Sequence, residues 1–285
     1  MKAKSKGSRL KVWRPQQVGL ELMRGVSASY STPRHFHQEL EIAVVQKGSP
    51  WEFHYRGAKH IVSPGCFTLT QPGEAHTAHV AGEISCTYYG LRVDSALIEN
   101  AATEVIGKQK GLPFFVPAVV TNKHLNKLVL DLHIALEKAS ASLLEQQSLV
   151  LGTLAQLILQ CAENSPVLQP VGAENQSVKR LRDYLEDNYA ENISLEQLAQ
   201  IANLSPFHLN RAFSKEVGLP PHAYQTQVRI ARARTMLTNG WSIGQVAVET
   251  GFTSQSHFGW HFKRLIGVTP GQYLKDSKNL IDRDG

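Results

Sequence analysis

Three histidines and one glutamate in the N-terminal third have the residue types and spacing of a ligand set. The segment HFHQELEIAVVQKG contains His35, His37 and Glu41, and His76 follows in the segment GEAH. Side chains two residues apart on a β-strand project to the same side, so the first two histidines and the glutamate share a face. His76 would approach from a later strand. Three imidazoles and a carboxylate could bind iron, manganese, zinc or nickel. The same residues could instead form a polar ring that hydrogen-bonds an organic ligand or one another.

The sequence around these four residues predicts short antiparallel strands. Between residues 18 and 93, β-type runs alternate with Gly and Pro, and these runs are EIAVVQKG, PWEFHYRG, KHIVSPG, CFTLTQPG and ISCTYYGLRV. Short strands at about ten-residue spacing are typical of a small antiparallel barrel or sandwich. Aromatic residues in these runs, including Trp51, Tyr55 and Tyr88, are candidates to line its interior.

Two predicted helices follow the strands. The segment NKHLNKLVLDLHIALEKA repeats Leu and Val at helical spacing, and residues 142–162 form a second, more apolar helix. Their spare apolar surface suits self-association as well as packing on the barrel. The stretch 163–176 contains two Pro and one Gly and is typical of a linker. We therefore divide the chain into residues 1–165, a linker at 166–176, and residues 177–285.

The C-terminal third contains an internal repeat. Residues 194–224 match residues 242–273, with an offset of 48 that becomes 49 after an insertion in the turn. Each copy predicts two short helices. Ser194 and Ser242 are candidate caps of the first helix, which ends at Asn203 in one copy and at Gly251 in the other. The second helix begins after Ser205 in the first copy, and after Thr253 or Ser254 in the second copy. Gly218 and Gly267 end these second helices.

Two short helices joined by a tight turn are typical of a helix-turn-helix, whose second helix enters the DNA major groove. A plain helical hairpin is the alternative. In the second copy Phe258, Phe262 and Leu265 recur at helical spacing and should face the core. The remaining faces supply the candidate DNA contacts, which are Phe207, His208, Asn210, Arg211, Ser214, Gln255, Ser256, Trp260 and Lys263.

The segment between the copies, PHAYQTQVRIARARTMLTNG, predicts one longer helix. It would hold the two second helices about 34 Å apart, one turn of DNA. Between Arg211 and Arg264 there are seven basic residues and two acidic residues. This excess suits a phosphate-binding face, although a solvated helix surface gives the same count. Arg229, Arg232 and Arg234 are candidate phosphate contacts on the linking helix.

Residues 178–275 resemble the DNA-binding domain of the AraC/XylS family of transcription regulators. The resemblance is carried by both units, the linking helix and the segment GFTSQSHFGWHFKRLIGVTPGQY. It implies base contacts from Phe207, Asn210 and Arg211 in the first copy, and from Gln255, Ser256 and Trp260 in the second copy. The family usually has Arg where this chain has Trp260, and a Trp cannot make a bidentate guanine contact. We therefore expect the first copy to carry most of the sequence specificity.

The N-terminal pattern H-x-H-x3-E-x6-G, followed by PGCFTLTQPGEAH, resembles the cupin barrel. This barrel is the effector-binding half of many AraC-type regulators, in which the polar-ring state is commoner than a metal site. Cys66 stands where an acidic residue usually follows the PG pair, so the family's usual contact in that loop is not expected here.

Composition is consistent with a soluble two-domain protein, because the 285 residues are 42% hydrophobic and 19% charged. No run of 18 apolar residues indicates a membrane span, and the basic N-terminus lacks the apolar core of a secretory signal. The 3 cysteines have no metal-binding or disulfide pattern. We therefore expect a cytoplasmic protein with no membrane partner.

These patterns together predict an α+β chain. Its N-terminal part is a cupin-like β-barrel with a helical dimerisation segment, and its C-terminal part is an all-α bipartite helix-turn-helix domain. We predict a regulator that binds a double-stranded DNA operator, that is not an enzyme and has no cofactor, and that forms a homodimer. RNA polymerase is a further candidate partner. A small polar effector would contact His35, His37, Glu41, Trp51, Tyr55, His76 and Tyr88.

The alternative function belongs to a different class of protein. It is a metal-dependent cupin enzyme, or a metal or redox sensor, in which the C-terminal helices are a docking module. Its metal ligands would be His35, His37, Glu41 and His76.

Overall fold

The computed structural model describes residues 9–15, 19–27, 31–82, 84–106, 111–137, 141–163 and 175–281. Two compact units are present, one formed by residues 1–137 with 149–169, and the other by residues 138–148 with 170–285. Residues 166–174 of the predicted linker lie outside the described residues. Across the described ranges, no helix has the length and apolar character needed to cross a membrane.

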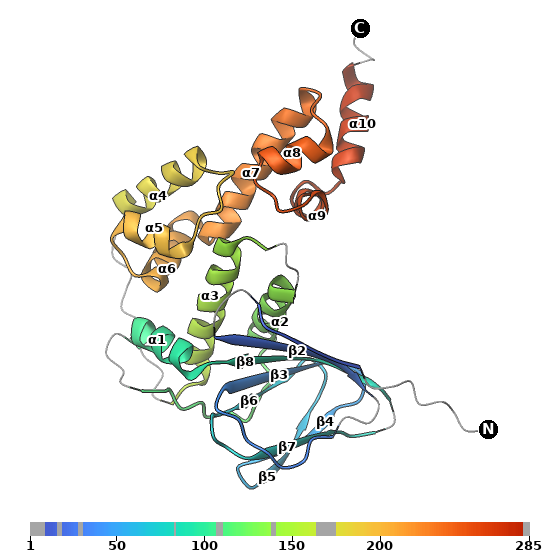
Figure 1. The fold of residues 1–285 in the computed structure, drawn as a ribbon, viewed down its shortest axis with the longest axis vertical. Coiled ribbons are helices and arrows are strands. Elements are labelled where there is room, and N and C mark those ends of the chain that lie inside the picture. The colour runs from blue at the N-terminus through green and yellow to red at the C-terminus, as the bar shows by residue number, and fades with distance from the viewer. Residues whose placement is uncertain are drawn as a thin grey trace, which may run out of the picture. The chain divides into compact units, whose positions relative to one another are not determined.

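The first unit contains two antiparallel sheets (Figure 1). The strand order is β1-β2-β8-β3-β6-β9 in the larger sheet and β5-β4-β7 in the smaller sheet. The strands are β1 (Arg9–Trp13), β2 (Leu20–Ser27), β3 (Leu40–Lys47), β4 (Trp51–Tyr55), β5 (Ala58–Val62), β6 (Phe67–Thr70), β7 (His76–Val80), β8 (Cys86–Val93) and β9 (Val119–Val120). The predicted runs correspond to β3, β4, β5, β6 and β8. Strand β7 was not among them, because its sequence HTAHV lacks a run of β-type residues.

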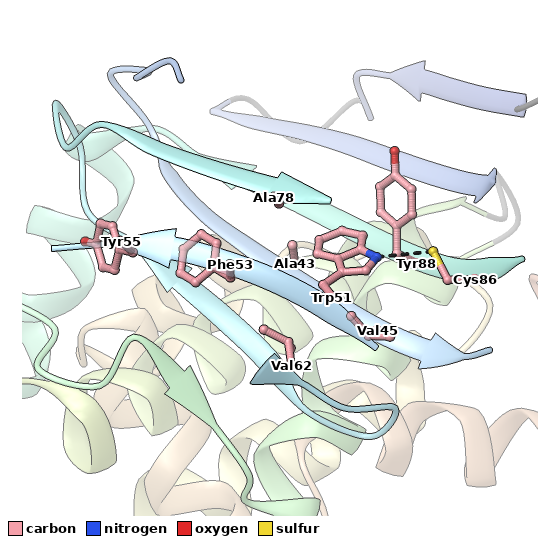
Figure 2. Close-up of a cluster of buried hydrophobic side chains, with 9 residues drawn as sticks. All are labelled: Ala43, Val45, Trp51, Phe53, Tyr55, Val62, Ala78, Cys86 and Tyr88. Carbon is pink, nitrogen blue, oxygen red and sulfur yellow. Dashed lines mark hydrogen bonds between the residues drawn. The ribbon is translucent and has the colours of Figure 1, made fainter. Parts of the chain in front are cut away.

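Side chains from both sheets fill the space between them. Trp51, Phe53 and Tyr55 alternate along β4 and are each 2% exposed. They pack with residues of the larger sheet, including Tyr88 of β8, as Figure 2 shows. The indole Nε1 of Trp51 donates to the Sγ of Cys86 at 3.1 Å. Burying apolar side chains from two facing sheets is what holds such a sandwich together.

Among the described residues, the helices of the first unit are α1 (Ser95–Ile106), α2 (Lys123–Glu137) and the later turns of α3 (Leu143–Cys161). Leu125, Val129, Leu132 and Leu136 of α2 are buried, as the amphipathic pattern predicts. His133 of the same helix is also buried, and its Nε2 bonds to the carbonyl oxygen of Met23 at 3.0 Å.

The second unit contains the first turns of α3 and a series of further helices. They are α4 (Asn175–Asp187), α5 (Leu195–Ala202), α6 (Pro206–Val217), α7 (Pro221–Thr238), α8 (Ile243–Glu249), α9 (Gln255–Ile266) and α10 (Pro270–Ile281). The predicted repeat is therefore α5–α6 and α8–α9, and α7 is the predicted linking helix. The fold prediction of a β-rich first part and a helical second part is confirmed.

The helix ends follow the predicted residues. Ser194 and Ser242 both form capping boxes, with Gln197 and Gln245 respectively. Ser205 and Ser254 cap α6 and α9 with the side-chain oxygen alone, which accepts from the backbone N–H of His208 and His257, so Ser254 rather than Thr253 is the second cap. Each cap accepts a hydrogen bond from a backbone N–H that the helix itself leaves unpaired.

The two short turns use different residues to reverse the chain. Asn203 ends α5 in the left-handed conformation at φ 53°, and Gly251 has φ 74° after α8. A Cβ added to Gly251 would lie 2.1 Å from the carbonyl oxygen of Ala190. Only glycine fits at position 251, because both the dihedral angle and the close backbone approach exclude a side chain.

The core of the second copy differs from the prediction at one position. Phe258 and Phe262 are fully buried, but Leu265 is 42% exposed. Ile266 packs against the core in its place. The step from Phe262 to Ile266 is a full i, i+4 step, which keeps the side chain on the buried face at the last turn of α9.

Candidate functional site

The structure brings the three predicted barrel histidines together. His35 and His76 pair through a β-bridge, and their ring centroids lie 4.4 Å apart. The ring centroid of His37 lies 5.0 Å from that of His76 and 6.0 Å from that of His35. One ring nitrogen from each residue lies within 4.8 Å of the other two. The three predicted histidines therefore converge, but the expectation that His35 and His37 lie on a strand is wrong, because β3 begins only at Leu40 and His35 forms an isolated bridge with His76.

Backbone carbonyl groups fix the protonation of all three rings. The Nδ1 atoms of His35, His37 and His76 lie 2.9, 2.8 and 3.2 Å from the carbonyl oxygens of Pro33, Glu39 and Glu74. A carbonyl oxygen only accepts, so each Nδ1 carries a proton, and in the neutral form of each ring the Nε2 presents a lone pair. The Nε2 of His37 is buried and has no hydrogen-bond partner among the described residues. The trio therefore offers three acceptor atoms to a ligand.

Glu41 is held beside this trio by an arginine that the sequence reasoning missed. The Nε of Arg92 donates to Oε2 of Glu41 at 2.8 Å, and the same carboxylate lies 3.5 Å from the Nε2 of His37. Arg92 also lies 3.4 Å from Glu21. Glu41 and Arg92 are paired across β3 and β8, a register that no local sequence signal indicates.

The environment of His76 favours the neutral form of its ring. Burial lowers the pKa of His76, and the neighbouring rings of His35 and His37 add to that effect. The carbonyl of Glu74 and the carboxylate of Glu41 act in the opposite direction. Neutral imidazoles are the form that accepts a hydrogen bond or binds a metal ion.

The donor set fits a divalent metal ion as well as an organic ligand. Metal-binding histidines commonly donate their other ring N–H to a carbonyl oxygen, as all three rings do here. His35, His37 and His76 would be the ligands, and a bound ion would act as a charged centre in the barrel. Glu41 is already engaged by Arg92, so its carboxylate is a neighbour of the trio rather than a clear fourth ligand.

The three predicted aromatic effector contacts lie inside the barrel but are tightly packed. Trp51 and Tyr88 meet edge to face with their centroids 4.8 Å apart. Tyr55 donates to Glu74 and accepts from the backbone N–H of Gln71. Burial and the bond to Glu74 raise the pKa of Tyr55 to about 12. These residues form core contacts in this structure (Figure 2), and their contact with an effector stays a prediction.

A hollow of about 380 Å³ reaches His76 from the side of the smaller sheet. The sequence reasoning did not single out the basic side chains that line it, which include Arg34, His54 and Arg56. Arg56 is bound to Glu74 and to the carbonyl oxygens of Phe115 and Val116. The positions of Arg34, His54 and Arg56 in the sequence did not indicate a shared site, because they lie on a strand and in two separate loops that meet only in the fold.

The predicted reading face of α6 is only partly exposed. His208, Arg211 and Ser214 are half-buried, whereas Phe207 and Asn210 are buried with 8% and 9% exposure. The expectation that Phe207 and Asn210 face outward is wrong. Helix α6 packs against α4, α5 and α7, so its covered arc is wider than the single stripe assumed from the sequence.

The predicted reading face of α9 is open. Gln255, Ser256, Trp260 and Lys263 are all exposed, and Trp260 is 47% exposed. The guanidinium of Arg264 lies over the indole of Trp260 at 5.1 Å. This face combines an amide, a hydroxyl, an indole and two cations, which are groups that DNA-binding proteins use for bases and phosphates.

One of the three arginines proposed as phosphate contacts on α7 has a structural role instead. Arg229 is 4% exposed, and its Nε and guanidinium nitrogen donate to the carbonyl oxygens of Tyr189 and Glu191 at 2.6 and 2.9 Å. Burial lowers the pKa of Arg229 to about 10. Arg232 and Arg234 are exposed, as a phosphate contact requires.

Comparisons with known proteins agree with this architecture. Residues 198–276 match the family model of a helix-turn-helix domain, and residues 17–152 match that of an AraC-like ligand binding domain. An uncharacterized HTH-type transcriptional regulator of Bacillus subtilis, YbfI, is 31% identical over 79% of this chain and 80% of its own length. The HTH-type transcriptional activator RhaS of an Enterobacter strain is 25% identical over 84% of this chain and 86% of its own length.

A ligand-binding β-domain joined to a duplicated helix-turn-helix defines the class of the protein as a DNA-binding transcriptional regulator. The chain belongs to the AraC family of HTH-type transcriptional regulators. The predicted family, fold class and general function are confirmed.

Proposed function

We propose that this regulator reads an operator with α6 and α9, and that a small polar effector bound at the barrel histidines controls the binding. The carrying observation is the pair of capped second helices, each of which turns polar or basic side chains outward. The proposed base and phosphate contacts are His208, Arg211, Ser214, Gln255, Ser256, Trp260 and Lys263.

The chemistry of the barrel site narrows the effector class. Three Nε2 lone pairs converge, so the bound group donates hydrogen bonds, as the hydroxyls of a sugar or the ammonium of an amino acid do. The effector can shift the protein between two states only if its affinity differs between them. We propose that effector binding changes the affinity of the regulator for its operator. The change raises the affinity in an activating response to the effector and lowers it in a releasing response.

DNA recognition is tested by selecting duplexes from a random pool with the full chain and then titrating the selected site in a gel-shift assay. We expect the selected site to contain two half-sites, and we expect Arg211→Ala to lower specific affinity by about 5- to 150-fold. Glu216→Ala, also on α6, is the matched control. Equal affinity of Arg211→Ala and the parent chain would remove Arg211 from the reading face.

The effector site is tested by screening sugars and amino acids for ligands that raise the unfolding temperature. A true ligand stabilises the parent chain and loses its effect in His37→Asn. His124→Asn, which changes an exposed histidine at the start of α2, should respond like the parent. A ligand that stabilises all three proteins equally does not bind at the trio.

A metal ion is the second candidate occupant of the barrel, favoured by the three Nδ1 contacts to carbonyl oxygens. Metal analysis of untagged protein, followed by operator binding with and without a chelator, separates the two cases. Stoichiometric metal with catalytic turnover would indicate an enzyme. Metal-dependent operator binding that is lost in His37→Ala would indicate a metal sensor. Operator binding that responds to oxidation, and loses this response in Cys66→Ser, would indicate a redox sensor.

We further propose that the regulator is not an enzyme, acts in the cytoplasm, forms a homodimer through the helical segment 123–162, and contacts RNA polymerase at the promoter. Family membership supports these proposals. Light scattering on the purified chain tests the dimer. A mass of one chain at micromolar concentration would contradict it.

A further inference from the structure

A second cluster of metal-binding side chains lies within the helical unit. It consists of His257 and His261 of α9 and Glu145 in the first turn of α3, a turn that belongs to the same compact unit. One ligand atom from each residue lies within 4.8 Å of the other two. We propose that Glu145, His257 and His261 bind a divalent transition metal ion, with zinc as the best match.

The geometry of the cluster is close to that of a zinc site. The Nε2 atoms of His257 and His261 lie 2.8 Å apart, and Oε2 of Glu145 lies 4.0 Å from the Nε2 of His257. Two nitrogen ligands of a tetrahedral zinc ion lie about 3.3 Å apart, given zinc–nitrogen distances of about 2.0–2.1 Å. A separation of two histidines by four residues places both rings on one face of a helix. Two imidazoles and one carboxylate are a ligand set found in zinc proteins, with water in the fourth position.

The protonation of the two rings can accommodate the ion. Oγ1 of Thr253 lies 3.1 Å from the Nδ1 of His257, so the hydroxyl can hold the proton on Nδ1 and leave the Nε2 lone pair for a ligand. Without an ion, one Nε2–H donates to the other Nε2. An ion would replace that hydrogen bond, and the donor ring would then carry its proton on Nδ1 in place of Nε2. The ring of His261 is 7% exposed, and burial of this kind favours the neutral imidazole that a metal ion binds.

Two arginines oppose the binding of a cation. The positive charges of Arg264 and Arg229 both lower the pKa of His261 and would also repel a metal ion. The carboxylate of Glu145 acts against this repulsion and also favours the charged form of Arg229. Arg229 is held by the carbonyl oxygens of Tyr189 and Glu191 and cannot turn toward the ion. We therefore expect an affinity in the micromolar range, weaker than that of a closed structural zinc site.

The cluster distinguishes the second copy of the repeat from the first. With the offset of 49 residues, His257 corresponds to His208 and His261 corresponds to Ala212. The first copy therefore lacks the second imidazole. The ring of His261 packs edge-on against Trp260 with centroids 4.6 Å apart. A metal ion bound to His257 and His261 would hold these two side chains in place, next to Trp260 of the proposed reading face.

The experiment uses the full chain with the other two candidate clusters removed. His37→Asn disrupts the barrel trio, and His54→Asn disrupts the cluster formed with Glu52 and His79. Zinc is titrated into this background variant by calorimetry, and thermal unfolding is followed with and without zinc. We expect one zinc ion per chain and a zinc-dependent rise in the unfolding temperature.

Glu145→Gln in the same background keeps the size of the side chain and removes its charge. We expect zinc affinity to fall by at least about tenfold. Removing a residue that only hydrogen-bonds to a zinc ligand already has an effect of that size, and Glu145 is a proposed ligand itself. Glu216→Gln on α6 is the matched control and should bind zinc like the background. His257→Gln is a second ligand variant, and circular dichroism without zinc checks that each variant is folded.

The proposal is wrong if the background variant binds no zinc at millimolar concentration. It is also wrong if the folded Glu145→Gln and His257→Gln variants bind zinc as tightly as the control. These outcomes do not depend on operator binding or on the barrel effector, so the proposed function is tested separately.

Discussion

The second helices of the two helix-turn-helix units begin and end at the same residue types but present different surfaces. Ser205 and Ser254 cap the second helix of each copy, and Gly218 and Gly267 end it in the left-handed conformation. At equivalent positions, however, Arg211 of α6 is matched by Trp260 of α9 and Ser214 is matched by Lys263. The comparison teaches that the two copies share the residue types that begin and end the second helix, whereas the outward residues of that helix differ.

The divergence shifts the available contacts toward the second copy. Burial removes Phe207 and Asn210 from the face of α6, whereas the corresponding arc of α9 stays open. Trp260 lacks the donors for a bidentate guanine contact, but Gln255 retains those for adenine. We therefore expect α9 to contribute more to recognition than the sequence alone suggests.

The largest effect is expected at the turns, where the copies use different residues. Gly251→Ala should destabilise the helical unit by about 3 kcal/mol or more, because a Cβ meets the carbonyl oxygen of Ala190 and φ is positive. Asn203→Gly, at the corresponding turn of the first copy, should change stability by less than about 1 kcal/mol. Urea unfolding of both variants measures the difference. Similar losses of unfolding free energy in the two variants would show that the two turns do not differ in their requirement for a particular residue.

A smaller effect on DNA binding distinguishes the two reading faces. Gln255→Ala should weaken specific binding by about 1–3 kcal/mol, because the amide can pair with an adenine edge. Asn210→Ala should leave specific affinity unchanged, because that side chain is buried. Gel-shift titrations at one fixed salt concentration make the comparison. If Asn210→Ala has the stronger effect, α6 turns to expose that residue when it binds.

The N-terminal caps of α6 and α9 should contribute equally to the stability of the helical unit. Ser205→Ala and Ser254→Ala should each cost about 1 kcal/mol of stability, because each removes an acceptor for a backbone N–H of the first turn. Ser256→Ala, at an exposed position after the cap, is the control and should cost less than about 0.5 kcal/mol. Chemical unfolding tests this, and a marked inequality between the two caps would break the structural equivalence.

The smallest effect concerns phosphate contacts. Lys263→Ala should reduce the slope of log affinity against log salt by about 1, and Ser214→Lys should increase it by about 1. Ser214→Lys gives the first copy the residue type that the second copy has at the equivalent position, and Lys263→Ala removes that charge from the second copy. Salt titrations on one operator measure both slopes. An unchanged slope for Lys263→Ala would place this side chain away from the DNA backbone.

The elements that depend on local sequence could be predicted. The capping serines, the left-handed Asn203 and the glycine stops all act within a few residues, so their types identify the helix ends. The convergence of the barrel histidines was also predicted, although the bridge between His35 and His76, and not a strand that carries His35 and His37, brings the rings together. The burial of Asn210 could not be predicted, because a helical stripe does not reveal how many neighbours cover the helix.

Residues brought together only by the tertiary fold gave no signal in the sequence. Arg92 lies opposite Glu41 through the pairing of β3 with β8, and no pattern within either strand indicates it. Glu145 and His257 likewise meet through helix packing, so their cluster became visible only in the structure. Leu265 was wrongly predicted to be buried in place of Ile266. Both residues fit the amphipathic pattern, because they follow Phe262 by three and by four residues.

Arg229 joins the linking helix to the segment that precedes the first helix-turn-helix through two carbonyl oxygens. The separation of α6 and α9, the two proposed reading helices, is then set when the protein folds, before it meets a target. One base pair inserted between two half-sites would rotate one of them by about 34–36° around the duplex axis. A preset separation cannot follow that rotation, so the natural targets of this regulator should share a single spacer length.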